Sequence, residues 1–237
     1  MRTAALVLAA GQGLRLGAGG PKAFVRLQGK TLLERSLVTM CRVPALCRVV
    51  PVVPAEDGAA GMALQVDVGA DKLAGPVPGG ARRQDSVAAG LASLPDDIEW
   101  VAVHDAARCL VSVEEVEAVL DGARATGAAI LARPSPDTLK LVQQGVIAST
   151  PERSACWAAQ TPQVFRVELL REGLEKAQAD AFTATDDAQL VERLGASVRI
   201  VEGRSSNLKI THPIDLVIAE ALLEQDENDM PERGGAS

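Results

Sequence analysis

The chain begins with a short apolar run that leads directly into a glycine-rich loop. The run covers 4–8, Gly11, Gly13 and Gly17 follow, and Pro21-Lys22 closes the segment. An apolar run of this length bounded by turn residues is typical of a buried strand. Glycines let backbone N–H groups come close to a ligand, because no side chain intervenes. This pattern therefore predicts a strand of an α/β sheet that ends in a loop able to bind an anion.

Several kinds of loop share part of this pattern. Arg15 and Lys22 are either solvated charges beside a tight turn or cations that bind phosphate. A dinucleotide-binding loop needs G-x-G-x-x-G and an acidic residue about 20 positions later. Here the glycines give G-x-G-x-x-x-G, and the next apolar run ends in Pro54-Ala55. A Walker A loop is excluded because no G-K-S/T follows. If the loop binds a ligand, the remaining candidate is a nucleoside triphosphate that is held by a loop of another kind.

Length and composition fit one compact α/β domain. A chain of 237 residues that is 47% hydrophobic can bury a sizeable core. Its net charge of −7 and its aromatic content of 2% argue against a nucleic-acid partner. No apolar run approaches the roughly 18 residues of a membrane-spanning helix, and the N-terminus lacks a signal-peptide cleavage pattern. We therefore expect neither a membrane partner nor secretion.

The cysteines give little basis for a metal site. Cys41, Cys47, Cys109 and Cys156 form no C-x-x-C pair, and the chain has only two histidines. Free thiols in a reducing compartment are the simplest interpretation, so we expect a cytoplasmic protein.

Strand and helix signals alternate along the chain. The segments 31–34 and 112–115 have the spacing of capping boxes, which predicts that helices begin there. Hydrophobic periodicity predicts a further helix over 82–94 and strands over 48–53, 100–104 and 128–132. Such alternation is typical of a mostly parallel sheet with helices on both faces. Ligands of these sheets bind beyond the carboxyl ends of the strands.

A β-hairpin interrupts this alternation. The runs 137–142 and 146–150 alternate with period two around Gln143-Gln144-Gly145. The hairpin arm, about 134–156, either projects from the body and offers an apolar face to another subunit, or lies flat on its own domain. We expect a single domain over 1–224 that contains this arm, followed by a polar, disordered tail over 225–237.

The segment from His104 to Arg108 follows a predicted buried strand. Asp105 is placed to position a metal–phosphate complex or a substrate hydroxyl, and Arg108 to bind a phosphate bidentately. The alternative is a salt bridge between the two that closes the loop. His104 continues the strand, and we interpret it as a packed structural residue rather than a base. His212, beside Pro213, is expected at the surface.

Polar residues gather at three further places. Gly79-Gly80, followed by Arg82, Arg83 and Ser86, forms either an anion- or base-binding turn or a plain helix start with solvated arginines.

Late in the chain, Thr185-Asp186-Asp187 has the residues of a helix cap. The segment 203–211 is interpreted as a polar, basic lead into a strand. Lys209 would supply a third cation near phosphate if that strand joins the same sheet edge.

These motifs together resemble one family, the 2-C-methyl-D-erythritol 4-phosphate cytidylyltransferases of the non-mevalonate isoprenoid pathway. The resemblance covers about 4–224 and rests on motifs that occur in the right order. They are Leu8-Ala9-Ala10-Gly11-x-Gly13-x-Arg15 with Pro21-Lys22, Gly79-Gly80-x-x-Arg83-x-x-Ser86, Val103-His104-Asp105-Ala106-Ala107-Arg108, Asp137-Thr138-Leu139-Lys140, Arg153, Gln160-Thr161-Pro162-Gln163, Thr185-Asp186-Asp187-Ala188 and Asn207-x-Lys209-Ile210-Thr211.

The resemblance implies a Rossmann-like α/β nucleotidyltransferase that moves the cytidylyl group of CTP to methylerythritol phosphate with Mg²⁺. It implies catalytic roles for Arg15, Lys22 and Lys209. It implies CTP contacts at Ala9, Ala10, Gly11, Gly13, Gly80, Ser86, Asp105 and Ala106. It implies contacts to the sugar phosphate at Asp105, Arg108, Thr138, Arg153, Thr161, Thr185 and Lys209. Asp105 is the nearest candidate for a metal contact, while the CTP phosphates would supply most of the ligands of the ion.

The resemblance also implies a homodimer in which the arm crosses to the second subunit, so that Arg153 serves the neighbouring site. Two positions depart from the family pattern: Cys109 stands where proline is usual, and Ala81 stands where some members have aspartate. Two alternatives stay open. A ribitol 5-phosphate cytidylyltransferase would share the fold, although the double alanine at 106–107 favours methylerythritol phosphate. A non-catalytic nucleotide-binding module would be expected to have lost one of the cations.

Overall fold

A seven-stranded sheet forms the centre of the molecule in the computed structural model, which describes residues 2–11, 21–55 and 69–229. The strand order is β11-β7-β10-β6-β1-β4-β5. Neighbours pair in parallel except β10, which runs antiparallel to both β6 and β7. The strands are β1 (Thr3–Leu8), β4 (Leu46–Val53), β5 (Val77–Pro78), β6 (Trp100–Asp105), β7 (Ala128–Pro134), β10 (Trp157–Arg166) and β11 (Arg199–Glu202). The expected α/β fold with a mostly parallel sheet is confirmed.

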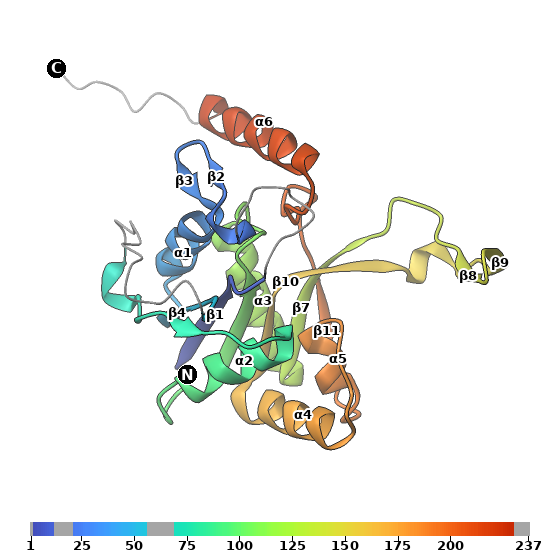
Figure 1. The fold of residues 1–237 in the computed structure, drawn as a ribbon, viewed down its shortest axis with the longest axis horizontal. Coiled ribbons are helices and arrows are strands. Elements are labelled where there is room, and N and C mark those ends of the chain that lie inside the picture. The colour runs from blue at the N-terminus through green and yellow to red at the C-terminus, as the bar shows by residue number, and fades with distance from the viewer. Residues whose placement is uncertain (1, 12–20, 56–68, 230–237) are drawn as a thin grey trace.

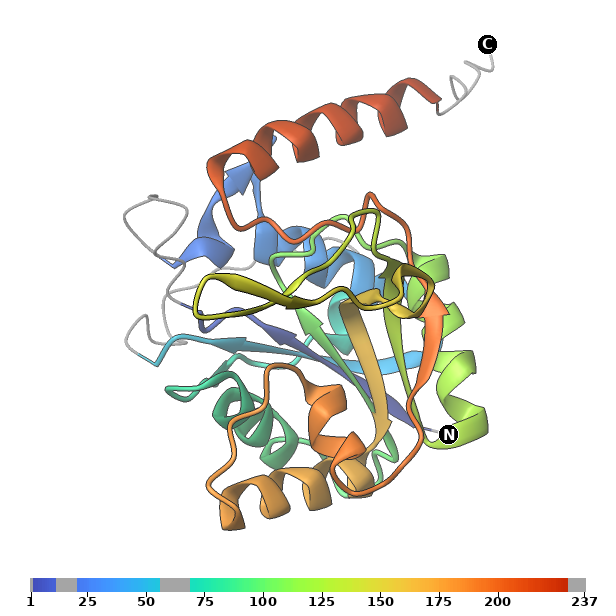
Figure 2. The same cartoon turned by 90° about the vertical axis from the view of Figure 1, so that its right-hand side faces the viewer.

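Helices cover both faces of the sheet (Figures 1 and 2). They are α1 (Leu32–Arg42), α2 (Arg83–Ala92), α3 (Val113–Thr126), α4 (Val167–Ala179) and α5 (Asp187–Glu192). A further helix, α6 (Pro213–Asp229), lies at one end of the body (Figure 1) and packs in a separate, smaller cluster with Leu27 and Leu32. Residues of α1 and α3 share one hydrophobic core, and residues of α2, α4 and α5 share a second. Along β1, Ala5 and Val7 enter the first core while Ala4 and Leu6 enter the second, because successive strand side chains point to opposite faces.

The two predicted capping boxes are present. The Thr31 hydroxyl accepts from the Glu34 backbone N–H at 3.1 Å, and the Glu34 carboxylate accepts from the Thr31 N–H at 2.7 Å. Ser112 and Glu115 exchange the same pair of bonds at 3.2 and 3.0 Å. Each box satisfies N–H groups that a helix start leaves without an intrahelical partner. The starts of α1 and α3 therefore lie where the sequence predicts them.

The predicted hairpin projects from the body as an arm (Figure 1). It pairs β8 (Leu141–Gln143) with β9 (Val146–Ser149) around Gln144 and Gly145, whose positive φ angles of 49° and 80° suit a tight hairpin turn. A short 3₁₀ turn, η4 (Arg153–Ala155), lies in the returning limb. Apolar side chains on the arm are exposed, with Val146 at 70% and Ile147 at 59%. The alternative of a hairpin lying flat on its own domain is wrong.

Further short elements lie outside the main sheet. A 3₁₀ turn, η2 (Lys22–Phe24), precedes a two-stranded ribbon of β2 (Arg26–Leu27) and β3 (Lys30–Thr31). A second turn, η3 (Ala70–Lys72), leads toward β5. The helices of the described residues include none that is long and apolar enough to cross a membrane.

Two boundaries differ from the sequence expectations. The tail was expected from 225, but α6 continues to Asp229, so the polar residues at its end extend the helix. The segment 203–211 holds no strand; it is a loop between β11 and α6. The Ile210 N–H nevertheless donates to the Ala107 carbonyl at 2.9 Å, which ties this loop to the end of β6. Lys209 therefore reaches the sheet edge from a loop.

Candidate active site

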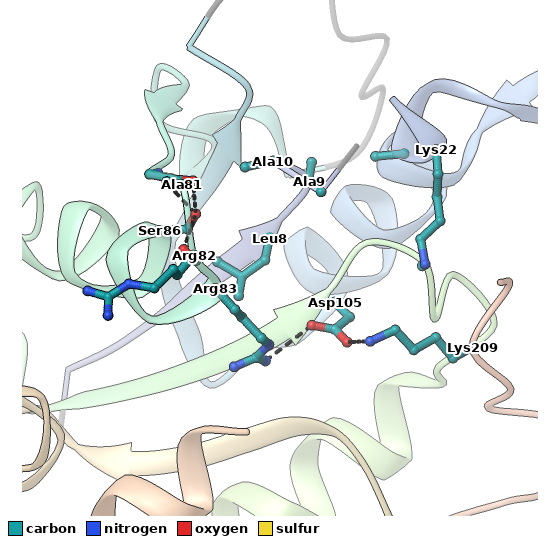
Figure 3. A pocket seen from close by; sticks show the side chains of 14 residues that line it. Leu8, Ala9, Ala10, Lys22, Ala81, Arg82, Arg83, Ser86, Asp105 and Lys209 are labelled. Atoms are coloured by element: carbon teal, nitrogen blue, oxygen red, sulfur yellow. Dashed lines mark hydrogen bonds and ion pairs between the residues drawn. The ribbon is translucent and has the colours of Figure 1, made fainter. Parts of the chain in front are cut away.

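A pocket of about 210 Å³ opens at the carboxyl ends of β1 and β6, beside the first turn of α2 (Figure 3). Its lining brings together most of the residues expected to bind CTP. The lining residues are Leu8, Ala9, Ala10, Gly11, Lys22, Ala23, Gly80, Ala81, Arg82, Arg83, Ser86, Asp105, Ala107 and Lys209. The position agrees with the rule that ligands of parallel sheets bind beyond the carboxyl ends of the strands.

The first loop and the glycine turn before α2 pack closely together. The Ala9 N–H donates to the Val52 carbonyl at 2.7 Å, so the chain stays parallel to β4 as it enters the pocket. A Cβ on Gly79 would stand 2.5 Å from the Ala10 Cβ and 2.8 Å from the Ser86 hydroxyl. Glycine is therefore required at this position, because any side chain would push the two walls of the pocket apart.

The Ser86 hydroxyl shapes the glycine turn. It accepts from the Gly80 N–H at 3.1 Å and lies 3.3 Å from the Arg82 carbonyl, to which it can donate. Ser86 is 4% exposed, so its hydroxyl stabilises the glycine turn from the buried side. Its expected contact with CTP stays a prediction.

Asp105 lies at the centre of a charge cluster in the pocket (Figure 3). Its Oδ2 is 2.6 Å from Lys209 Nζ, and its Oδ1 is 3.1 Å from Arg83 Nη2. Burial would raise the pKa of the Asp105 carboxyl, but the charges of Arg83 and Lys209 outweigh burial and hold the pKa well below its usual range. Asp105 is therefore an anion at neutral pH that fixes two cations at the pocket floor.

Arg83 has a second partner that sequence reasoning missed. Its Nη1 is 2.5 Å from Oδ2 of Asp187, the first residue of α5. Burial lowers the pKa of Arg83, but the two carboxylates outweigh it and the pKa is raised overall. The sequence does predict the helix cap here, since the Asp186 side chain accepts from the Gln189 N–H. The contact with Arg83 could not be found in this way, because it joins two elements far apart in the chain.

His104 and Thr161 lie behind Asp105, away from the pocket. The Thr161 hydroxyl is 3.1 Å from His104 Nδ1 and accepts from the Asp105 N–H at 3.0 Å. Burial lowers the pKa of His104 to about 4, and the ring is fully buried, so the interpretation as a packed residue is confirmed. We expected Thr161 to contact substrate. In the structure it is 4% exposed and its hydroxyl supports the Asp105 backbone, and the substrate contact stays a prediction.

Arg108 turns away from Asp105 toward the loop before α6. Its Nη1 donates to the Asn207 carbonyl at 2.8 Å, and its Nη2 donates to the Ala159 carbonyl at 3.0 Å. The alternative of a salt bridge between Asp105 and Arg108 is therefore wrong for this structure. Arg108 instead ties β10 and the 203–211 loop to the end of β6.

The other expected site residues lie apart from the pocket. Thr138 and Arg153 belong to the projecting arm, and both are exposed. Thr185 is exposed and bonds the Gln189 side chain. Ala106 is 1% exposed, and its carbonyl accepts from the Ser36 hydroxyl at 3.0 Å. The expectations for Gly13 and Arg15 fall outside the described residues.

The donor atoms of the pocket offer little to a metal ion beyond one carboxylate. Across the described ranges, no group of three or more His, Cys, Asp or Glu side chains is placed to hold an ion. Asp105 is the one carboxylate among the lining residues given above, and both of its oxygens face cations. Such a site fits a Mg²⁺ ion that arrives on phosphate oxygens, because Mg²⁺ is usually bound by few carboxylates together with substrate phosphates and water.

Comparisons with known proteins point to a single family. The model of the family described as 2-C-methyl-D-erythritol 4-phosphate cytidylyltransferase matches residues 3–225. Relatives of that name from Desulforamulus reducens and Chromobacterium violaceum are 42% and 44% identical, over 93% and 92% of this chain and 95% and 96% of theirs.

Two crystal structures share the fold. A 4-diphosphocytidyl-2C-methyl-D-erythritol synthase from Anaerococcus prevotii superposes with a TM-score of 0.81 at 31% identity, covering 94% of this chain and 98% of its own. A 2-C-methyl-D-erythritol 4-phosphate cytidylyltransferase from Thermus thermophilus gives 0.76 at 38% identity, covering 94% and 100%. The chain belongs to the 2-C-methyl-D-erythritol 4-phosphate cytidylyltransferase family.

Proposed function

We propose that the chain transfers the cytidylyl group of CTP to 2-C-methyl-D-erythritol 4-phosphate, releasing pyrophosphate, as a step of isoprenoid precursor biosynthesis. Membership of the family supports this reaction. The observation that carries the proposal is the composition of the pocket. Small residues at the end of β1 face Lys22, Lys209 and Arg83 across a space with one carboxylate. This arrangement suits a polyphosphate, which carries several negative charges and accepts hydrogen bonds from backbone N–H groups.

The reaction needs no strong general base. A phosphate monoester carries an ionised oxygen at pH 7, and this oxygen attacks the α-phosphorus of CTP while pyrophosphate leaves. His104 does not line the pocket, and its lowered pKa of about 4 keeps the buried ring neutral. The absence of a histidine from the lining residues given above is therefore consistent with the chemistry. Catalysis consists of positioning the two substrates and stabilising charge.

The cations have distinct proposed places. Lys22, in η2, and Lys209, in the loop before α6, approach the pocket from different elements. They would offset charge on the α-phosphate and on the departing pyrophosphate, together with Arg15. Backbone groups of Ala9, Ala10 and Gly11 would bind the triphosphate, and Gly80 the base. Mg²⁺ bound to the phosphates would neutralise further charge, with Asp105 as the carboxylate nearest to it.

The sugar phosphate is proposed to bind beside the α-phosphate, near Arg108 and Thr185. Thr138 and Arg153 would reach it from the arm of a second subunit, since in their own chain they lie on a projection. The exposed apolar side chains of the arm support a homodimer, because a projecting apolar surface is stabilised by a partner. We propose that this dimer acts in the cytoplasm.

The position of the transferred label tests the reaction. CTP labelled at the α-phosphorus is incubated with the protein, Mg²⁺ and methylerythritol phosphate, and the products are separated. We expect the label in the organic product and none in pyrophosphate, because attack occurs at the α-phosphorus. Label that stays with CTP in the complete mixture would contradict the proposed function.

A further inference from the structure

A chain of ion pairs runs from a buried carboxylate to the pocket. Asp187 is 1% exposed and contacts Arg83, which in turn contacts Asp105, which holds Lys209. Arg83 joins the two carboxylates through different nitrogens, Nη1 and Nη2. A planar guanidinium can bridge two anions in fixed directions, which a lysine ammonium cannot do. The starts of α5 and α2 and the end of β6 are thereby linked.

Asp187 is placed independently of Arg83. The side-chain oxygen of Gln163, on β10, accepts from the backbone N–H groups of Asp187 and Ala188, both at 3.0 Å. The Gln163 amide nitrogen donates to Asp186 Oδ2 at 2.9 Å. Gln163 is 1% exposed and sits within the central sheet. Gln163 on β10 therefore holds the backbone that carries the buried Asp187 carboxylate.

Burying a carboxylate of this kind costs free energy, so a gain in stability alone does not explain its presence. Burial raises the pKa of Asp187, and the nearby positive charge of Arg83 opposes this. Replacing buried ion pairs by apolar residues is often neutral or stabilising, so the pair is weak evidence of a stabilising role. What Asp187 does provide is a fixed direction for Arg83, and hence for the Asp105 carboxylate at the pocket floor.

Lys209 is the residue that needs such support. It lies in a loop, its side chain is 43% exposed, and its ammonium is 2.6 Å from Asp105 Oδ2. A lysine side chain has several rotatable bonds, so an exposed one samples many positions unless a partner holds it. We propose that Asp187 is a positioning residue: through Arg83 it fixes Asp105, and through Asp105 it fixes the Lys209 ammonium at the reacting phosphates. This inference rests on the proposed function.

The first test is Asp187→Asn, which keeps the size of the side chain and removes its charge. We expect kcat to fall about tenfold while KM for CTP stays within about twofold, because a small misplacement of a catalytic group lowers turnover strongly and Asp187 does not line the pocket. The matched control is Asp180→Asn. Asp180 also pairs with two cations, Arg193 and Lys176, but lies outside the site, so both constants should stay at wild-type values.

A double-mutant cycle separates positioning from a merely structural role. If Asp187 acts through Lys209, then Asp187→Asn should cost little further activity in a Lys209→Ala background, because the group it positions is already gone. Labelled CTP and long incubations make the slow variants measurable. An equal loss in both backgrounds, or a wild-type kcat for Asp187→Asn, would overturn the proposal.

Two controls keep the test decisive. Should Asp187→Asn not fold, Arg83→Lys replaces it: the charge remains, but one ammonium cannot bridge both carboxylates. Because Arg83 itself lines the pocket, the double-mutant cycle is again the readout: we expect a similar loss of kcat alone and little further loss in the Lys209→Ala background. Wild-type turnover, or an equal loss in both backgrounds, would count against the inference. Should the unmodified protein itself produce no cytidylyl product, the proposed function fails, which is a different result from a fully active Asp187→Asn variant.

Discussion

Single residues set the charge of the pocket, and their partners come from several elements. Asp105 and Lys22 belong to short contiguous motifs, so the sequence alone indicated them. The contact of Arg83 with Asp187 could not be predicted, because it depends on how α5 is placed against α2. Thr161 likewise belongs to a motif, but only its burial shows that its hydroxyl supports the Asp105 backbone. Motifs thus identify residues, and packing decides what each one touches.

Lys22→Ala should lower kcat at least about 10²-fold, because a cation at the phosphates of a nucleotide supplies on the order of 10³-fold in phosphoryl transfer. Pyrophosphate release measures the change, and thermal unfolding checks that the fold is kept. Lys30→Ala is the control, since Lys30 is exposed on β3 and does not line the pocket. Near-normal turnover by Lys22→Ala would contradict its assigned role.

His104 makes stability depend on pH. Burial lowers its pKa to about 4 from 6.5. Between about pH 4 and pH 6.5 the ring is therefore protonated in the unfolded chain and neutral in the folded chain. Stability due to the neutral ring is complete above about pH 6.5 and is lost as the pH falls toward 4. The loss from pH 7.5 to pH 5 should be about 2 kcal/mol.

Urea unfolding at the two pH values measures this effect. His104→Gln should show a smaller drop in unfolding free energy than the unmodified protein. His212→Gln should leave the drop unchanged, because His212 is exposed. An identical drop in the His104 variant would show that other groups cause the acid sensitivity.

Whole elements follow local sequence rules where those rules are strong. The starts of α1 and α3 and the hairpin turn were predictable from capping and turn residues. The strand β10 was not, because it buries polar side chains at Gln160, Thr161 and Gln163, which breaks the alternation of apolar and polar residues. The extension of α6 to Asp229 was missed for a related reason: its polar end has the composition of a tail.

The cap of α1 provides a prediction at this scale. Thr31→Ala should lower the free energy of unfolding by about 1 kcal/mol, since the hydroxyl that accepts from the Glu34 N–H is lost. Urea unfolding with an unchanged m-value would measure this. Thr39→Ala, in the middle of the same helix, should cost nothing or stabilise slightly because alanine has the higher helix propensity. A capping variant as stable as the unmodified protein would refute the argument.

The whole molecule is a compact α/β body with one arm that reaches away from it (Figure 1). The sequence predicts both parts, but one chain places Thr138 and Arg153 away from the pocket that their family resemblance assigns to them. A second subunit, as proposed above, would resolve this conflict. In the proposed dimer, each active site would therefore contain residues of both subunits.

Mixing two inactive variants tests whether the site is shared. Arg153→Ala and Lys22→Ala homodimers should each be nearly inactive. In a mixed dimer, one site lacks both residues, and the other has Lys22 from one subunit and Arg153 from its partner. Random exchange from equal amounts should therefore restore about a quarter of wild-type activity, with half of the dimers mixed and one site active in each. No recovery after verified subunit exchange would show that Arg153 serves its own chain.

The transfer of a cytidylyl group to methylerythritol phosphate is the reaction on which the roles of the pocket residues depend. Its most direct test is pyrophosphate release from CTP and Mg²⁺, with methylerythritol phosphate and ribitol 5-phosphate offered in parallel reactions. We expect release with methylerythritol phosphate alone. Release with ribitol 5-phosphate alone would keep the mechanism and contradict the pathway, and no release with either substrate would contradict the enzymatic function itself.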